Sequence, residues 1–422
     1  MSKLDFIRKS ALSLNYLGLV LRGLSMFSKL VLVLLLTKYS GLEQLGIYGL
    51  FVSSVAVLNY LQGLEFYRYT ARELSLSDPE RNTQMIVNQF AIHLVTYLVI
   101  LPISVFAFCG NFLPWELLGF FLWISVCSHI GQEANRLLIV FGGITQAYIV
   151  SFVVHGLWAC IAIAIFFYYP EQANLRSILW LWGASSLVGV VLGGGYLSQY
   201  IVLGSLVLKV DYGWVVRGLK VCAKFFVAVM AVKTIELSDR FFLQYYYDEA
   251  LVGVYTMFGS VAKLVQEFVY TGLIVTVIPL LLSHYREKKF AEYERLLWGL
   301  QKNIVIFSLL ITVVGIAAMY LLLIYLDRVE LKDNIFTYFI LLFSAFVINL
   351  SMIPYYRLYL AGKEMILAKT ALVGMLINTM LNLLLVPVFG AIGAATATIV
   401  SFCFIYLANM YLASKYTLRH AR

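Results

Sequence analysis

Apolar residues in this chain form long continuous runs and do not alternate with polar residues. A run of about 20 apolar residues is long enough to cross the hydrocarbon layer of a bilayer as an α-helix. Lipid cannot hydrogen-bond a bare backbone, so a continuous apolar run that spans it must be helical. The runs predict about twelve spans, at residues 11–36, 45–64, 86–108, 117–140, 147–169, 177–203, 222–244, 252–282, 303–326, 334–361, 368–388 and 390–412.

The polar segments between these runs are short, which predicts an all-α integral membrane protein without a soluble domain. The longest of them lie near residues 65–85, 204–221 and 283–302. Within the last, residues 284–298 mix Lys, Arg and Glu with Phe, Leu and Trp, which predicts a short amphipathic helix on the membrane surface. A break between the last two spans is expected from Pro387 to Gly390.

Composition agrees with this interpretation, and charge adds an orientation. Hydrophobic residues make up 62% of the chain and charged residues 13%, whereas about a quarter of a soluble chain is charged. With the N-terminus inside, the inner segments carry twenty Lys and Arg and the outer segments four. The positive-inside rule therefore places both termini in the cytoplasm. This bias explains most of the net charge of +9, so anionic lipid headgroups are favoured over nucleic acid as its counterpart.

Two pairs of short motifs indicate an internal repeat. Gly46-Ile-Tyr and Gly253-Val-Tyr open the second and eighth spans, and Arg136-Leu and Arg357-Leu end the fourth and tenth. Six spans separate the copies, and an even number preserves orientation, so the repeats would be parallel. We therefore expect two parallel six-helix lobes around a central cavity. The predicted lobes are residues 1–203 and 222–412, with a cytoplasmic linker at 204–221 and a cytoplasmic tail at 413–422.

Ionisable residues inside the spans are costly and usually face protein or water. The basic ones are Arg22, Lys29, Arg136, Lys233, Arg240, Lys263 and Arg357. The acidic ones are Glu133, Glu236, Asp239 and Glu267. Two acids have a nearby basic residue on their own helix, which predicts Glu133–Arg136 and Lys263–Glu267 pairs.

The first span carries an unusual polar face. Asn15, Arg22 and Lys29 are spaced by seven residues and therefore share one side of a helix. No acidic residue lies within this span to neutralise Arg22, which is near its centre. Such a guanidinium needs a water-filled cavity, a partner helix or an anionic ligand, and we favour a functional role.

The seventh span holds Lys233, Glu236, Asp239 and Arg240 within eight residues, which predicts a partnered cluster with a coupling role. Asn378 and Asn382, four residues apart in the eleventh span, are placed to bridge helices. The histidines and cysteines lack metal-ligand spacing, so no metal site is expected. No catalytic residue is predicted either.

These features together resemble the O-antigen flippases of the Wzx type, in the superfamily that includes multidrug exporters and lipid II flippases. The residues that carry the resemblance are the basic face of the first span, Gly46-Ile-Tyr48, Glu133-Ala-Asn-Arg136, Asp239-Arg240 with Gly253-Val-Tyr255, and the ending from Asn378 to Thr398. The resemblance covers nearly the whole chain. It implies translocation of an undecaprenyl-pyrophosphate-linked oligosaccharide from the inner to the outer leaflet of a bacterial inner membrane, alongside other polysaccharide assembly proteins.

Within that superfamily, about twelve spans argue against the lipid II flippases, which have two more. The excess of basic over acidic residues in the spans suits an anionic substrate, and Arg and Lys are natural partners of a pyrophosphate. The candidate substrate-binding residues are Asn15, Arg22, Lys29, Arg136, Lys233, Arg240 and Arg357. The candidate ion-coupling residues, for a proton or sodium gradient and with no other cofactor, are Glu133, Glu236, Asp239 and Glu267.

Two other functions remain open at this point. A cation-coupled multidrug exporter of the same superfamily would be favoured by an acidic cavity. A membrane polysaccharide polymerase or ligase would act on the same lipid-linked sugar, but it would need a sizeable outer loop, and the outer loops are each under about ten residues. A pure scaffold would not explain charges inside the spans.

Overall fold

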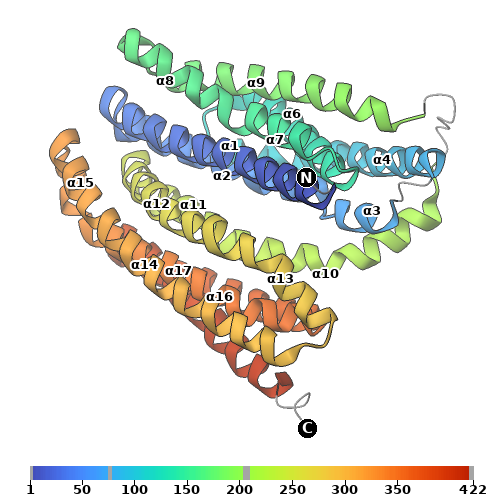
Figure 1. Cartoon of the computed structure of the whole chain (residues 1–422). Coiled ribbons are helices and arrows are strands. Elements are labelled where there is room, and N and C mark those ends of the chain that lie inside the picture. The colour runs from blue at the N-terminus through green and yellow to red at the C-terminus, as the bar shows by residue number, and fades with distance from the viewer. Residues whose placement is uncertain (1–2, 75–77, 203–209, 418–422) are drawn as a thin grey trace. The chain divides into compact units, whose positions relative to one another are not determined.

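The computed structural model describes residues 3–74, 78–202 and 210–417, with side chains described from Leu17 to Lys415 outside the two internal gaps. Every regular element in the described part is helical (Figure 1). The α-helices are α1 (Lys3–Tyr39), α2 (Gly41–Gly63), α3 (Tyr67–Glu73), α4 (Pro79–Ser104), α5 (Phe106–Cys109), α6 (Leu118–Val140), α7 (Ile144–Phe152), α8 (Trp158–Tyr168), α9 (Leu175–Leu197), α10 (Tyr212–Leu237), α11 (Asp239–Tyr246), α12 (Glu249–Val269), α13 (Val275–Arg286), α14 (Phe290–Leu326), α15 (Val329–Asp333), α16 (Ile335–Leu360) and α17 (Glu364–Thr417).

The helices agree with the predicted spans. In the described part of the chain, nine helices are long and apolar enough to cross a membrane. The longest of these, α17, holds two predicted spans and is non-helical at Gly390, where φ is 54° and ψ is −129°. These angles are not helical, so the predicted break between the last two spans is confirmed. The backbone conformation is one that glycine adopts and other residues avoid. The remaining two predicted spans fall on α6 and on α10 with α11, which are more polar.

Two predicted spans are each built from two α-helices joined by a π-helical turn. Residues Val153–Leu157 join α7 to α8, and residues Tyr270–Ile274 join α12 to α13. The predicted surface helix at residues 284–298 is wrong as a separate element. After the turn that follows Arg286, α14 begins at Phe290 and continues without interruption to Leu326. The amphipathic residues are therefore the first turns of a helix whose later part is apolar.

The chain packs into two compact units, each with its own contacts. Unit 1 comprises residues Met1–Ser40 and Leu50–Phe226, and unit 2 comprises Gly41–Gly49 and Val227–Arg422. Unit 2 is therefore discontinuous in sequence, because it includes the first nine residues of α2. The predicted lobe boundaries and the central cavity stay predictions.

The core of unit 1 is aromatic and aliphatic. Trp158 on α8 stacks on Trp182 on α9 with ring centroids 5.1 Å apart.

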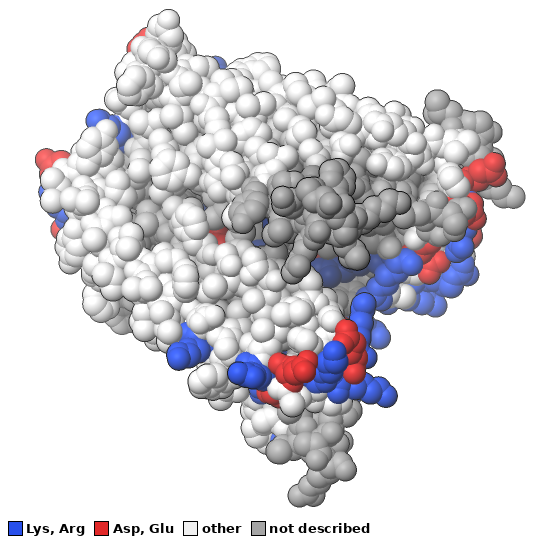
Figure 2. Space-filling model, viewed as in Figure 1, with Lys and Arg blue, Asp and Glu red and all other residues white. Residues whose placement is uncertain are grey.

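Figure 2 shows a largely uncharged face, with Lys and Arg gathered toward its margins, as expected of a surface that faces lipid. In unit 2, Arg286, Lys288 and Lys289 are exposed at the turn between α13 and α14.

The motif glycines of the proposed repeat meet one another inside unit 2. A Cβ added at Gly46 on α2 would lie 1.9 Å from the carbonyl oxygen of Glu249, and one added at Gly253 on α12 would lie 2.0 Å from that of Leu42. Leu42 lies four residues before Gly46, and Glu249 lies four residues before Gly253. Each glycine therefore packs on the helical turn that precedes the other glycine. Only glycine permits helix backbones to approach this closely.

Candidate ion and substrate site

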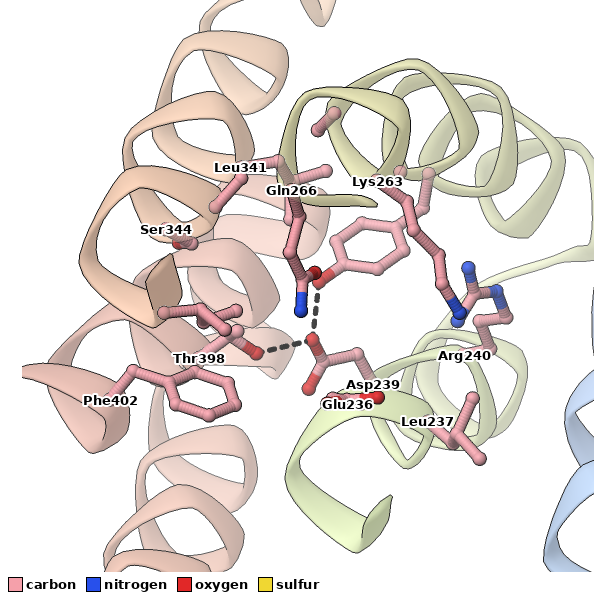
Figure 3. Close-up of a pocket in the computed structure, with 15 residues that line it drawn as sticks. Glu236, Leu237, Asp239, Arg240, Lys263, Gln266, Leu341, Ser344, Thr398 and Phe402 are labelled. Atoms are coloured by element: carbon pink, nitrogen blue, oxygen red, sulfur yellow. Dashed lines mark hydrogen bonds between the residues drawn. The ribbon is translucent and has the colours of Figure 1, made fainter. Parts of the chain in front are cut away.

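A pocket in unit 2 collects most of the charged residues of the seventh predicted span. Its volume is about 100 Å³, and residues of α10, α11, α12, α16 and α17 line it (Figure 3). A space of this size has room for a few water molecules or an ion. It is well below the roughly 300–1,000 Å³ of sites for drug-sized ligands.

A short interruption between α10 and α11 places Asp239 in this pocket. Helix α10 ends at Leu237 and α11 begins at Asp239, with Ser238 between them. The Ser238 hydroxyl donates a hydrogen bond to Asn378 Oδ1 on α17, at a distance of 3.3 Å. Asp239 is thus the first residue of a helix, where the helix dipole favours a negative charge.

Asp239 is 1% exposed and is held by neutral hydrogen-bond donors. Its Oδ2 accepts hydrogen bonds from the hydroxyls of Thr398, at 2.6 Å, and of Tyr255. Its Oδ1 accepts one from Asn382 Nδ2, at 3.0 Å. Figure 3 shows Thr398 reaching the carboxylate from α17. Among the residues that the structure describes, no cation lies within ion-pair distance of Asp239.

The cations near Asp239 have other contacts. Lys233 forms an ion pair with Glu236 at 2.6 Å. Arg240 Nε donates a hydrogen bond to Thr256 Oγ1 at 3.3 Å, and its guanidinium lies 5.8 Å from the centre of the Tyr255 ring. Neither residue neutralises Asp239 by direct contact.

Arg240 and Lys263 both line the pocket, and Figure 3 shows their cationic ends pointing toward one another. The predicted Lys263–Glu267 ion pair is not found among the described side chains, and Glu267 does not line the pocket. The pocket therefore presents two cations and two carboxylates, Glu236 and Asp239. Its charges are balanced, so this pocket is neither the basic site expected for an anionic substrate nor the acidic site expected for a multidrug exporter.

The basic face of the first span lies within unit 1. Ser25 Oγ donates a hydrogen bond to the backbone oxygen of His155 at 3.2 Å, so this face packs on the helix that follows α7. Arg22 is exposed, and its guanidinium lies 5.5 Å from the centre of the Tyr148 ring. Lys29 is half-buried. The side chain of Asn15 lies outside the described residues.

The two arginines of the repeat motif have carboxylate partners. Arg136 pairs with Glu133, which confirms the predicted i,i+3 pair. The guanidinium of Arg136 also lies 3.9 Å from the centre of the Tyr67 ring on α3. Burial raises the pKa of the Tyr67 phenol, so this ring stays neutral beside the cation.

Arg357, the second of these arginines, pairs with Glu294 on α14. The seven predicted basic residues are thus distributed over both units, and Arg240 and Lys263 are the two that line the pocket.

Sequence reasoning missed two partners of the buried carboxylate. Tyr255 was noted only as part of the Gly253-Val-Tyr motif and Thr398 only as the end of the stretch from Asn378, and nothing in the sequence indicated that their hydroxyls contact Asp239. Asn382 was indicated by its spacing from Asn378, and its bond to Asp239 confirms the predicted bridge between helices.

No protein-family model matches the chain, and no curated protein matches it. Solved structures do. A multidrug resistance MATE family transporter of the MOP superfamily, in an inward-facing conformation, superposes with a TM-score of 0.70 at 14% identity, covering 95% of this chain and 98% of that one. The chain has the fold of a MOP-superfamily transporter.

Two further solved structures share this fold. The lipid II flippase MurJ, in an inward closed conformation, gives a TM-score of 0.66 at 14% identity, covering 94% of this chain and 87% of MurJ. An outward-facing MATE family transporter gives 0.63 at 14% identity, covering 95% of each chain. At these identities the likeness concerns the fold. The protein is a multi-pass helical membrane protein with the fold of these solved structures.

Proposed function

We propose that this protein is a secondary transporter that flips an undecaprenyl-pyrophosphate-linked oligosaccharide from the inner to the outer leaflet of a bacterial inner membrane. The observation that carries this proposal is the convergence of Arg240 and Lys263 on one pocket. Two neighbouring cations in an apolar helix bundle repel one another, and an anionic group between them relieves the repulsion. A phosphate group matches their charge and hydrogen-bonding capacity.

The size of the pocket limits which part of the substrate it can bind. A space of about 100 Å³ excludes an oligosaccharide. In our proposal the pocket receives one phosphate group or a coupling ion, while the sugars and the prenyl chain lie elsewhere. Arg22 and Lys29, on α1, are candidates for a second contact with the headgroup.

Asp239 is the proposed coupling carboxylate. It is buried, it is held by hydroxyl and amide donors, and its pocket contains Arg240. A proton or sodium ion arriving at Asp239 would change the charge beside Arg240 and thereby the affinity for an anionic group. Alternating access by two lobes would then carry the substrate across.

The test is a flipping assay in proteoliposomes with a fluorescent polyprenyl-pyrophosphate-linked sugar, scored by its accessibility to an impermeant quencher. Replacing both pocket cations, Arg240→Gln with Lys263→Gln, is expected to reduce flipping at least tenfold. The matched control is Arg176→Gln, which removes an exposed arginine that lies 3.6 Å from Glu116. Wild-type flipping by the double variant, at normal protein level, would refute the proposed role of the pocket.

A second function has its own support. Glu236 and Asp239 balance the two cations in the pocket, and two of the similar structures are multidrug resistance transporters. A cation-coupled multidrug exporter would therefore extrude cationic dyes from the same proteoliposomes without moving the lipid-linked sugar. Dye extrusion that is lost with Asp239→Asn, together with no flipping by the wild type, would replace our proposal with this one.

A further inference from the structure

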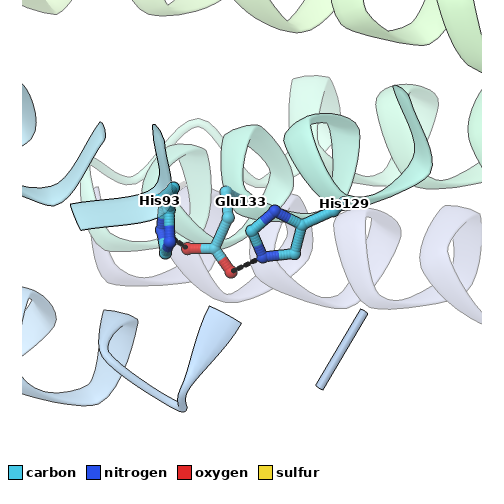
Figure 4. Close-up of side chains that lie close together, drawn as sticks. All are labelled: His93, His129 and Glu133. Carbon is cyan, nitrogen blue, oxygen red and sulfur yellow. Dashed lines mark ion pairs between the residues drawn. The ribbon is translucent and has the colours of Figure 1, made fainter. Parts of the chain in front are cut away.

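Two histidines and a glutamate that are not part of the unit 2 pocket converge inside unit 1. His93 lies on α4, and His129 and Glu133 lie one turn apart on α6 (Figure 4). His93 Nε2 is 3.5 Å from Glu133 Oε2, and His129 Nε2 is 3.8 Å from Glu133 Oε1. Each of the three side chains is at most 1% exposed. The three candidate ligand atoms all lie within 4.8 Å of one another.

The outer nitrogen of each imidazole is already bonded. His93 Nδ1 lies 3.3 Å from the backbone oxygen of Gln62, which can only accept, so this nitrogen carries the proton. His129 Nδ1 lies 2.7 Å from the hydroxyl of Tyr97. A bonded Nδ1 with Nε2 turned inward is the usual arrangement of a histidine that binds a metal.

This arrangement leaves the inner atoms poorly matched to one another. With Nδ1 protonated, the Nε2 atom of a neutral His93 carries a lone pair and faces a carboxylate. The amide nitrogen of Gln89 donates hydrogen bonds to Glu133 Oε2, at 2.6 Å, and to His93 Nε2, at 3.4 Å. His129 Nε2 is completely buried and has no hydrogen-bond partner. An unpaired polar atom in such a position is destabilising, and a bound cation would remove this cost.

Gly63 lies close to that unpaired nitrogen. A Cβ at Gly63 would lie 2.9 Å from His129 Nε2 and 3.7 Å from Glu133 Oε1, so a glycine at this position keeps a side chain away from the candidate ligand atoms. Gly63 is also the last residue of α2. The C-terminal end of a helix carries a partial negative charge, which favours a cation.

We propose that His93, His129 and Glu133 form a binding site for a divalent transition-metal ion of the Zn²⁺ class. Two imidazole nitrogens and a carboxylate oxygen are a common ligand set for zinc. In tetrahedral coordination with bonds of about 2.0–2.1 Å, neighbouring ligand atoms lie roughly 3.3 Å apart. The two nitrogen–oxygen distances are slightly longer than this and involve different oxygens of Glu133, and the ligand atoms are separated by up to 4.8 Å, so binding requires the side chains to move closer together.

The surrounding groups complete the proposed site. Arg136 holds Glu133 Oε1, the oxygen nearest to His129, and orients the carboxylate. Rotation of the Gln89 amide would turn its Oε1, which has no partner, toward the fourth position. The sequence predicted no metal site, because 36 residues separate His93 from His129 and only the fold brings them together.

The test uses purified, tag-free protein stripped with a chelator and titrated with Co²⁺, whose visible absorption reports tetrahedral coordination. We expect one Co²⁺ per chain, displaced by Zn²⁺, and an increase in Tm on addition of Zn²⁺. His129→Ala is expected to weaken binding at least tenfold. His155→Ala is the matched control, because it removes a histidine of unit 1 that is not in the cluster, and it should bind as the wild type does.

The result with the wild type decides the question even if a variant fails to fold. Absence of saturable Co²⁺ binding to the wild-type protein would overturn the proposal and leave the cluster as a hydrogen-bonded packing group. Unchanged binding by a folded His93→Ala, His129→Ala double variant would overturn it as well. Because the readout is metal binding and not transport, the outcome is independent of the proposed flipping activity.

Discussion

Replacing Asp239 with asparagine separates a coupling role from a structural one. The substitution preserves the shape of the side chain and removes its charge. Two of its three partners are hydroxyls, Tyr255 and Thr398, which can rotate to accept a hydrogen bond from the new amide. The third, Asn382, has an unpaired Oδ1 that amide rotation would make available. All three bonds can therefore be retained with a neutral side chain.

The expected effect on stability follows from these contacts. A hydrogen bond to a charged acceptor contributes about 1.5–3 kcal/mol and a neutral one about 0.5–1.5 kcal/mol, so three of them lose roughly 3 kcal/mol in total. Removing an ionised group from an apolar interior offsets much of that loss. We expect the free energy of unfolding to change by less than about 2 kcal/mol. Asp239→Ala, which leaves three buried donors unpaired, is expected to cost about 3 kcal/mol or more.

The assay measures coupling and stability separately. Flipping in proteoliposomes is followed with and without an imposed proton or sodium gradient, and Tm is followed by thiol labelling of the buried Cys127 and Cys222. In Asp239→Asn, the increase in flipping rate caused by the gradient is expected to be at least tenfold smaller than in the wild type, with an unchanged Tm. The matched control, Asp327→Asn, alters an exposed aspartate paired with Lys332. Full gradient-driven transport by Asp239→Asn with an unchanged Tm would refute the coupling role.

Three further predictions test other parts of the structure. Gly46→Ala places a methyl group against the Glu249 carbonyl and should lower stability by about 2 kcal/mol or more, whereas Gly299→Ala, with nothing within 4 Å, should raise it slightly; equal Tm values would contradict the close crossing. Arg22→Ala should abolish flipping in a normally inserted protein and Arg22→Lys should retain part of it, because lysine keeps the charge without the planar fork; full flipping by Arg22→Ala would exclude that contact. Reporter fusions after residues 75, 290 and 415 should be cytoplasmic and those near 112, 172, 247 and 330 external, and any reversed site would break the twelve-span topology.

Much of the fold was accessible from the sequence because a bilayer imposes simple rules. The apolar runs fixed where helices lie, and the break at Gly390 was visible because proline and glycine interrupt a helix. The surface helix near residue 290 was misassigned because an amphipathic helix on the membrane surface and the extension of a membrane span have the same sequence pattern. Here the distinction depends on the continuous helix from Phe290 to Leu326.

The candidate sites were accessible only in part. Asp239 stood out because a charge in an apolar run is rare, whereas Thr398, 159 residues further on, did not. The Lys263–Glu267 pair was expected from spacing alone, but Lys263 lines the pocket instead. Likewise, His93 and His129 have no shared spacing, and their meeting depends on how α4 packs beside α6.

The reciprocal glycine contact between α2 and α12 imposes an order in time on the growing chain. Gly46 is synthesised 207 residues before Gly253, which at about 5–20 residues per second is a delay of roughly 10–40 s. During that interval the first turns of α2 are in the membrane without the helix that later covers them. Lipid or another protein that contacts their glycine face in that interval must be displaced when α12 is inserted. Unit 2 therefore begins with one of the earliest segments of the chain and is completed with one of the latest.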